Sequence, residues 1–135
     1  MSERESFPGG CLCGAVRYVA RGPLRDVLIC HCVDCRRFHG GPGAYTALPK
    51  DDLELIVDWG LRWRTSSESD AAADRGFCGE CGSSLFWRAP ARTTISVAAG
   101  TLDGPSGLRT IGHIYDAQRA DWEHADDLPR RPGSS

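Results

Sequence analysis

The 135-residue sequence predicts a mainly β domain built of many short strands. Short runs that alternate apolar and polar residues, or that are rich in β-branched residues, recur along the chain, and Gly, Pro, Asp and Ser interrupt them. Glycine is frequent, with 16 residues, whereas only 8% of the residues are aromatic. This mixture favours strands and turns over long helices. The length fits one domain with a modest hydrophobic core.

The predicted strands follow one another between turn signals. Residues 15–20 alternate and stop before Gly22-Pro23, and residues 26–31 are apolar and β-branched. Further strands are expected at 44–49, 53–57, 61–65, 84–89 and 94–99. We expect these strands to form several short, coiled antiparallel sheets that pack on one another.

Helices are expected to be few and short. Residues 33–41 predict about two helical turns that end at glycine, and 115–123 predict a second short helix. We place the domain at 9–129, after a flexible arm at 1–8 and before a flexible tail at 130–135. The tryptophans are expected in the core or in the wall of a cleft; they are Trp59, Trp63, Trp87 and Trp122.

Charge and hydropathy exclude several classes of partner. The net charge is −2 and no basic stripe is present, so no nucleic-acid partner is predicted. The chain has no apolar signal-peptide core and no run near the roughly 20 apolar residues of a membrane span. We therefore expect a cytoplasmic protein without a membrane partner. Thiols stay reduced in the cytoplasm, which makes the seven cysteines better candidates for metal ligands than for disulfides.

The number of cysteines predicts two zinc sites. A structural zinc takes four protein ligands, whereas a catalytic zinc keeps three and leaves one position open. Two local pairs together give four sulfurs and leave a group of three, while the group of three with either pair would give five. The pairs are Cys11 with Cys13 and Cys78 with Cys81, and the group of three is Cys30, Cys32 and Cys35.

The spacing within each group supports this division. In an extended segment, residues i and i+2 point to the same side, so both sulfurs of a C-x-C motif can reach one metal. The stretch CGECG at 78–82 resembles a zinc knuckle, in which Gly79 and Gly82 allow a tight turn. A zinc shared by the two distant pairs would staple a small domain together.

The group of three has other possible readings. It is also compatible with a second structural zinc closed by Asp34, by His31 or by a distant histidine. His31 lies between two ligands of a strand and is expected to face away from their metal. Alternatively, Cys32 and Cys35 are compatible with a reversible redox disulfide that releases zinc.

Residues next to this group are candidates for substrate contacts. Arg36 and Arg37 can bind a substrate carboxylate, although the same pair also fits a solvated helix face. His39 and His113 are candidates for proton transfer, and both are also compatible with a purely structural role.

Three cysteine motifs occur in a fixed order along the chain. They read GGCLCGAVRY at 9–18, CHCVDCRRFHG at 30–40 and RGFCGECGSSLFW at 75–87, followed by LDG and by GHIYDAQRADWEHADDLP. From about 9 to 129 this pattern resembles the glutathione-dependent formaldehyde-activating enzyme family, also called the centromere protein V/GFA domain. The sequence differs from many relatives beside the second motif, where it reads FHGGPGAY with His39 and Gly43.

The resemblance implies a fold, a cofactor and an activity. It implies an Mss4-like fold of coiled β-sheets and two Zn²⁺ ions per chain. The structural zinc would take Cys11, Cys13, Cys78 and Cys81, and the catalytic zinc would take Cys30, Cys32 and Cys35.

The activity that follows is that of a carbon–sulfur lyase. The partner would be a small thiol such as glutathione, which adds reversibly to formaldehyde or to a related small electrophile. The alternative is a zinc-stapled module that binds a thiol, or senses redox state, without turnover.

Overall fold

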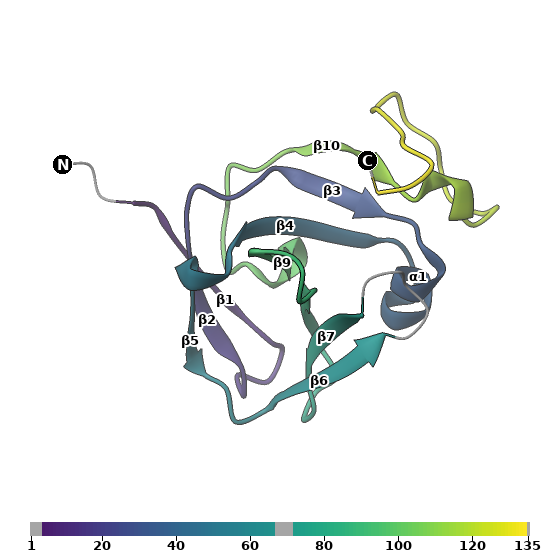
Figure 1. The fold of residues 1–135 in the computed structure, drawn as a ribbon. Coiled ribbons are helices and arrows are strands. Elements are labelled where there is room, and N and C mark those ends of the chain that lie inside the picture. Colours follow the sequence, from purple (N-terminus) through teal and green to yellow (C-terminus); the bar gives the residue numbers. More distant parts are fainter. Residues whose placement is uncertain (1–3, 67–71, 135) are drawn as a thin grey trace.

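The computed structural model describes residues 4–66 and 72–134, and in this part of the chain it has ten strands, one α-helix and three 3-10 turns (Figure 1). The strands are β1 (Ser6–Gly10), β2 (Arg17–Arg21), β3 (Val27–Cys30), β4 (Gly43–Pro49), β5 (Leu53–Val57), β6 (Leu61–Ser66), β7 (Ala73–Cys78), β8 (Ser84–Arg88), β9 (Thr94–Ala98) and β10 (Thr110–Ile114). The helix is α1 (Val33–His39), and the 3-10 turns are η1 (Lys50–Asp52), η2 (Ala99–Thr101) and η3 (Asp116–Gln118). The mainly β class is confirmed.

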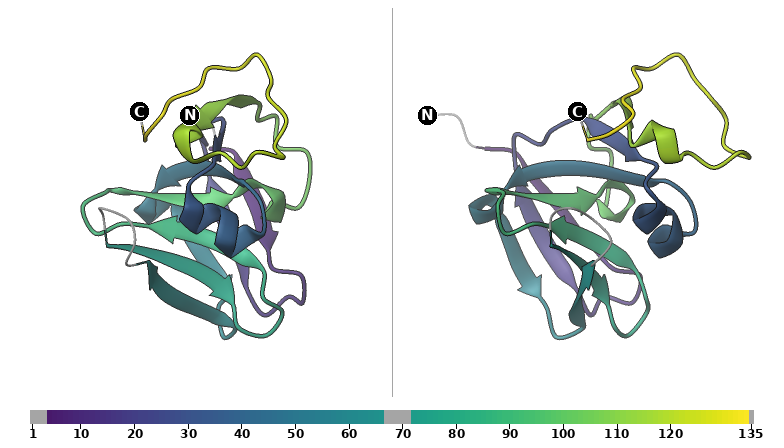
Figure 2. Two further views of the ribbon diagram at one scale, coloured as in Figure 1. Left: turned by 90° about the vertical axis from the view of Figure 1, so that its right-hand side faces the viewer. Right: turned by 45° about the vertical axis from the view of Figure 1, so that its right-hand side comes forward.

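The strands form two sheets. The small sheet has the order β1-β2-β5, and the large sheet has the order β10-β3-β4-β9-β8-β7-β6. All neighbouring strands described are antiparallel except β10 and β3, which are parallel and so depart from the purely antiparallel expectation. Figure 2 shows the small sheet lying against one side of the curved large sheet.

Alternation along the strands gives the large sheet two different faces. Phe86 and Val97 are directly opposite each other and buried, and the ring of Phe86 meets Tyr18 of the small sheet edge-on at 5.4 Å. These side chains belong to the main core between the sheets. Their neighbours Trp87 and Ser96 point the other way, because side chains alternate along a strand. The face of the large sheet that points away from the main core therefore presents a second set of side chains, which includes Trp87 and Ser96.

The helix is close to the predicted one. The side chain of Cys32 caps its first turn, and Gly40 ends it with a φ of 77°, a left-handed conformation that glycine adopts without steric cost. It has seven residues, and no helix in the described chain is long and apolar enough to span a membrane.

The ends of the chain correct two predictions. The arm expected at 1–8 is wrong for residues 6–8, because β1 begins at Ser6 and pairs with β2. Of the tail expected at 130–135, residues 130–133 also belong to the fold. Arg131 donates its backbone N–H to His113, and Gly133 accepts one from Tyr115. Residues 1–3 and 135 lie outside the described residues.

The sequence patterns did not predict the strands β7 and β10, and they predicted a longer helix at 115–123 than the structure has. The segment of β7 contains Ala, Asp and Gly, which disfavour strands, yet it forms between β6 and β8. The strand β10 contains Gly112, whose absent side chain leaves room for the carbonyl oxygen of Pro129. Of the helix expected at 115–123, only the 3-10 turn η3 forms.

The tryptophans divide between the core and the surface. Trp63 stacks on Phe86 of the main core and Trp87 lines a cavity, as expected. The expectation is wrong for Trp59, which is exposed, whereas Trp122, although also exposed, lines a second and smaller cavity of about 270 Å³.

Candidate metal centres

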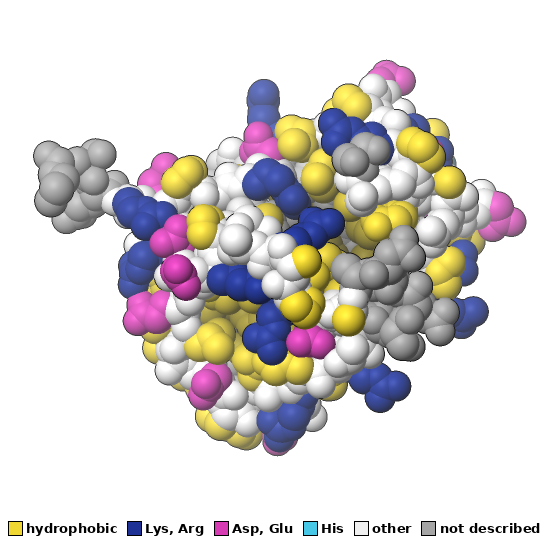
Figure 3. Space-filling view, viewed as in Figure 1, with side chains coloured by type: hydrophobic (Ala, Val, Ile, Leu, Met, Phe, Trp, Pro, Cys, Tyr) yellow, Lys and Arg dark blue, Asp and Glu magenta, His cyan; other side chains and the backbone are white. Residues whose placement is uncertain are grey.

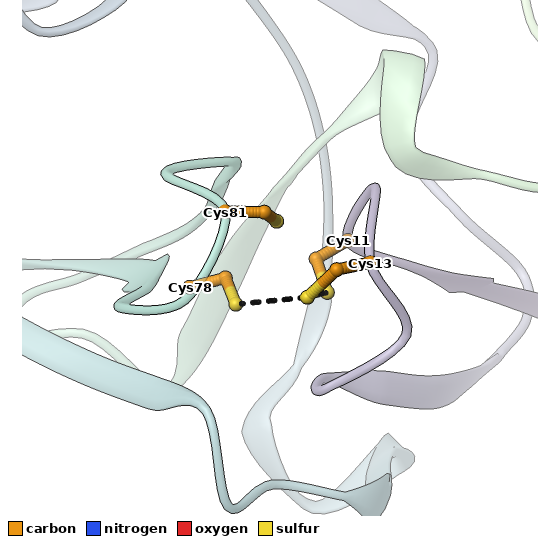
Figure 4. A group of neighbouring side chains, drawn as sticks. All are labelled: Cys11, Cys13, Cys78 and Cys81. Carbon is orange, nitrogen blue, oxygen red and sulfur yellow. Dashed lines mark hydrogen bonds between the residues drawn. The ribbon is translucent and has the colours of Figure 1, made fainter.

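Four cysteines from two distant turns meet at one end of the main core. Cys11 and Cys13 come from the turn between β1 and β2, and Cys78 and Cys81 come from the turn between β7 and β8. All four sulfurs lie within 4.8 Å of one another, and Figure 4 shows the side chains converging from the two facing turns. We call these residues the four-cysteine cluster. The structure thus brings together the two pairs that the sequence joins.

The sulfur positions fit a tetrahedral metal. The sulfurs of Cys11 and Cys13 are 3.8 Å apart, as are those of Cys13 and Cys78. A zinc ion with Zn–S bonds of ~2.3 Å requires sulfur–sulfur edges of ~3.8 Å. A disulfide would need ~2.05 Å. The cluster therefore has the dimensions of a closed four-sulfur metal site.

Polar groups beside Cys11 and Cys81 favour their thiolate forms. The backbone N–H of Val16 donates to the sulfur of Cys11 at 3.2 Å, and the hydroxyl of Ser83 lies 3.2 Å from the sulfur of Cys81. The hydroxyl and the backbone N–H of Ser83 together lower the pKa of Cys81 to about 5. Thiolate, and not thiol, is the form that binds metal.

The remaining three cysteines meet on the other face of the large sheet. Cys30 ends β3, Cys32 caps α1, and Cys35 lies in the first turn of that helix. Their sulfurs also lie within 4.8 Å of one another, and we call them the three-cysteine cluster. Hydrogen bonds from Cys30 and Cys35 lower the pKa of Cys32 to about 2, and sharing of the proton raises the pKa of Cys30. Among the described residues, no histidine or carboxylate joins this group as a fourth ligand.

A buried arginine faces the three-cysteine cluster. Both terminal nitrogens of Arg75, on β7, lie 3.6 Å from the sulfur of Cys35. Arg75 is only 5% exposed, its Nε has no hydrogen-bond partner in the described chain, and its guanidinium lies 5.5 Å from the centre of the Phe38 ring. Burial disfavours its charge, but the thiols, Cys35 foremost, more than offset this and raise the pKa of Arg75. No sequence motif predicts a role for this residue.

Arg75 places a positive charge directly beside the three-cysteine cluster. Three thiolates around a divalent metal carry a net charge of −1, and a buried cation beside them compensates it. Arg37 lines the cavity described next, but Arg36 is not among the lining residues in the described chain. Asp34 lines the same cavity, but among the described residues no carboxylate joins the three cysteines as a possible metal ligand.

The three-cysteine cluster opens into a cavity of about 930 Å³. The pairing of neighbouring strands determines which side chains line this cavity. Tyr45 is opposite Leu28 on one side and Ala98 on the other, and Trp87 is opposite Ser96, so these side chains share the face away from the main core. The segment after β10 closes one side with Tyr115 and Gln118. Sulfurs, aromatic rings and arginines therefore share one concave site.

A tyrosine–histidine pair lies beside the sulfurs. The hydroxyl of Tyr45 lies 2.6 Å from Nε2 of His39, and burial lowers the pKa of His39 and raises that of Tyr45. Gly43 makes this pair possible, because a Cβ there would lie 2.7 Å from the Tyr45 ring and 2.9 Å from the His39 ring. The contact between His39 and Tyr45 thus depends on the absence of a side chain at Gly43.

The other predicted histidines form a separate buried chain. Nδ1 of His31 meets a carboxylate oxygen of Glu123, its Nε2 lies 2.7 Å from Nδ1 of His113, and Nε2 of His113 lies 3.0 Å from Asp126. His31 faces away from the sulfurs, as expected for a residue between two ligands of a strand. His113 does not line the 930 Å³ cavity, so a direct role there in proton transfer is not supported. This chain holds the C-terminal segment against β3 and β10.

Comparisons with known proteins support one family. A family model described as glutathione-dependent formaldehyde-activating enzyme matches residues 6–118. The chain is similar in structure to a Rhodobacter sphaeroides protein solved by crystallography, with 23% identity and a TM-score of 0.60, over 73% of this chain and 90% of that one. This likeness shows the fold. No curated protein matches the chain.

Proposed function

The chain belongs to the glutathione-dependent formaldehyde-activating enzyme family, and from this premise we propose that it catalyses the reversible addition of a small thiol to formaldehyde or a related small electrophile. The thiol would bind in the cavity of the three-cysteine cluster. Such an activity is that of a zinc-dependent carbon–sulfur lyase. The four-cysteine cluster would hold a second zinc with a structural role.

One observation carries the proposal: three sulfurs meet at the wall of a large cavity, and no side chain of the described residues completes the set. A structural zinc normally takes four protein ligands, whereas a catalytic zinc keeps a position for water or substrate. Cys30, Cys32 and Cys35 would hold this ion. When bound there, zinc would lower the pKa of an incoming thiol, which is ordinarily near ~8.5.

The protein's own side chains would prepare the reaction. Arg75 would balance the negative charge that thiolates bring into a buried site. The aromatic walls at Tyr45 and Trp87 would hold the small electrophile out of bulk water. These groups position the reactants, which are known to combine in water even without a catalyst.

The chemical step needs only a proton and no redox partner. The sulfur of the thiol forms a bond to the carbonyl carbon, the carbon–oxygen double bond becomes single, and the proton lost by the thiol ends on that oxygen. We assign the Tyr45 hydroxyl, hydrogen-bonded to His39, as the donor to this oxygen; Tyr45 is reprotonated through His39, which takes up the proton released by the thiol. In the reverse direction, Tyr45 takes the proton of the adduct hydroxyl while it passes its own proton to His39, which returns it to the departing thiolate.

Exchange NMR tests this proposal. We expect the zinc-loaded protein to speed exchange between formaldehyde, glutathione and their adduct, and Cys35→Ala to abolish the increase. Thiol binding without faster exchange would contradict the enzyme and favour the binding module. A disulfide between Cys32 and Cys35 after mild peroxide, with loss of zinc, would favour the redox sensor.

A further inference from the structure

The stretch of chain that carries Cys32 lies between two elements and belongs to neither. β3 ends at Cys30 and α1 begins at Val33, so His31 and Cys32 join the strand to the helix. The backbone N–H of Cys35 donates to the sulfur of Cys32 at 3.2 Å, which shapes the first turn of the helix but does not place it relative to β3. The three sulfurs converge only if this junction follows one course, so contacts with other parts of the chain have to fix it.

The segment that follows β10 supplies such contacts. The carbonyl oxygen of Ile114 accepts the backbone N–H of His31 at 3.0 Å. The side-chain oxygen of Gln118 accepts the backbone N–H of Val33 at 2.8 Å. The residues on either side of Cys32 are therefore both bonded to this segment. Figures 1 and 2 show it lying beside the end of β3 and the start of α1.

The side chain of His31 is fixed at both of its ring nitrogens. Nδ1 meets a carboxylate oxygen of Glu123, and Nε2 lies 2.7 Å from Nδ1 of His113. The side chains of His31 and Glu123 are only 3% and 6% exposed, so water does not compete for their contact. Because His31 lies between Cys30 and Cys32, fixing its ring also restricts the backbone that joins these two cysteines.

Glu123 is itself held in a defined orientation. Its second carboxylate oxygen accepts the backbone N–H of Ala120 at 2.7 Å, within the same segment. Both oxygens of the carboxylate are therefore engaged, one with its own turn and one with His31. Buried polar groups whose hydrogen bonds are all satisfied make a structure rigid and specify one arrangement.

The same segment forms part of the cavity wall. Tyr115 packs against the three-cysteine cluster, with a φ of 53° that is uncommon for a residue other than glycine. Its backbone N–H donates to the carbonyl oxygen of Gly133 at 2.9 Å, so the end of the chain helps to hold this conformation. Figure 3 shows hydrophobic side chains next to Lys and Arg side chains on the face beside this segment.

We propose that Glu123 is a positioning residue for the three-cysteine cluster: through His31, it holds the chain between Cys30 and Cys32 in the course that lets the sulfurs converge. Gln118 supports the same stretch at the start of α1. The inference rests on the proposed function, because it takes this cluster as the second zinc site. It gives the C-terminal segment a role in metal retention, although neither Glu123 nor Gln118 is part of the cluster.

Competition between the zinc-loaded protein and a chelator tests the proposal, and Cys35→Ser identifies which of the two zinc ions belongs to the three-cysteine cluster. Residues that orient metal ligands typically contribute roughly 10- to 100-fold to metal affinity. We expect Glu123→Ala to lower the affinity for this ion by about 10-fold or more and to leave the affinity for the other ion unchanged. Glu123→Gln should keep part of the affinity, since an amide oxygen can still accept the N–H of His31.

Asp121→Asn and Leu48→Ala are the matched controls. Asp121 lies in the same segment, is exposed and takes no part in these contacts, so neutralising it should change neither affinity. Leu48 is buried in the main core and is not one of the described residues that line the cavity. Leu48→Ala should therefore destabilise the fold without weakening one zinc ion relative to the other.

Gln118→Ala keeps the proposal testable if Glu123→Ala does not fold. Gln118 is exposed, so its replacement should leave the fold intact. We expect the affinity for zinc at the three-cysteine cluster to fall by about 3-fold, the effect of one lost hydrogen bond. Gln118→Glu, which keeps an acceptor oxygen for the N–H of Val33, should restore it.

The outcomes separate this inference from the proposed function. If the folded variants of Glu123 and Gln118 keep the affinity of the unchanged protein, or if they weaken both zinc ions equally, the positioning role is overturned and the proposed function stands. If the unchanged protein holds no zinc at the three-cysteine cluster, both are overturned.

Discussion

The two cysteine clusters lie on opposite faces of the same large sheet and differ in what surrounds them. In the four-cysteine cluster, two turns from distant parts of the chain face each other, and their four sulfurs lie within 4.8 Å of one another. In the three-cysteine cluster, all three cysteines come from one stretch of six residues, and a cavity and a buried arginine lie beside their sulfurs.

The difference shows how one ligand type can serve stability in one place and chemistry in another. The first cluster connects segments 65 residues apart, from Cys13 to Cys78, and so constrains the fold. The second joins residues that β3 and α1 already hold close together, so a metal there adds little constraint. Its sulfurs instead face a space that a ligand can enter.

The largest expected effect is on stability, from Cys78→Ser. Cys78 is fully buried in the main core, and its loss opens the four-sulfur site. Structural zinc contributes roughly 10 kcal/mol or more to the folding of zinc-finger peptides. We expect the free energy of unfolding to fall by on the order of 5 kcal/mol, measured by urea denaturation of the zinc-loaded protein. A change below ~1 kcal/mol would contradict the structural role.

The matched substitution in the other cluster, Cys35→Ser, should separate the two roles. We expect the protein to lose one of two bound metal ions and all catalysed exchange. The free energy of unfolding should fall by only about 1–3 kcal/mol, a value typical of a buried substitution. Metal analysis and urea denaturation of the same sample measure both quantities. Destabilisation equal to that of Cys78→Ser would mean that both clusters are structural.

Substitution of Arg75 tests whether its charge supports the three-cysteine cluster. Arg75→Met keeps much of the volume but removes the cation beside Cys35. We expect affinity for the more weakly held zinc to fall by about 10-fold or more, with partial rescue in Arg75→Lys, as measured by competition with a chelator. Equal affinity in all three proteins would show that Arg75 has only a packing role.

The smallest expected effect on the fold comes from Tyr45→Phe. This change removes the hydroxyl that lies 2.6 Å from His39 but keeps the ring in the cavity wall. We expect catalysed exchange to slow by about 10²-fold, as for loss of a proton donor, with thiol affinity unchanged. Slower exchange that is accompanied by equally weakened thiol binding would indicate a binding role for the hydroxyl.

The sequence was sufficient to predict the local features of both clusters. The C-x-C and C-x-x-C spacings and the total of seven cysteines lead to the grouping that the structure brings together. Most strands with alternating or β-branched patterns were also predicted, as was α1 with its glycine end. These features depend on residues close together in the chain.

Features that depend on distant pairing were missed. Arg75 lies 40 residues from Cys35, in a strand whose composition gives no β signal, and only the order of β7, β8, β9 and β4 brings it to the cavity. The His31–Glu123 contact joins residues 92 apart and ties down a C-terminal segment that looks like a loose tail in sequence. Polar residues in such segments give no local signal of their partner.

Cadmium NMR of the cadmium-loaded protein tests most directly whether one cluster is closed and the other open. The resonance frequency of bound cadmium reports its number of sulfur ligands, so the two clusters should give two separate signals. On addition of glutathione, we predict that only the signal of the three-cysteine cluster moves, toward the position of the four-sulfur site, and that Cys35→Ser removes this signal alone. Two signals that both already lie at the four-sulfur position, or that both ignore the added thiol, would contradict the account.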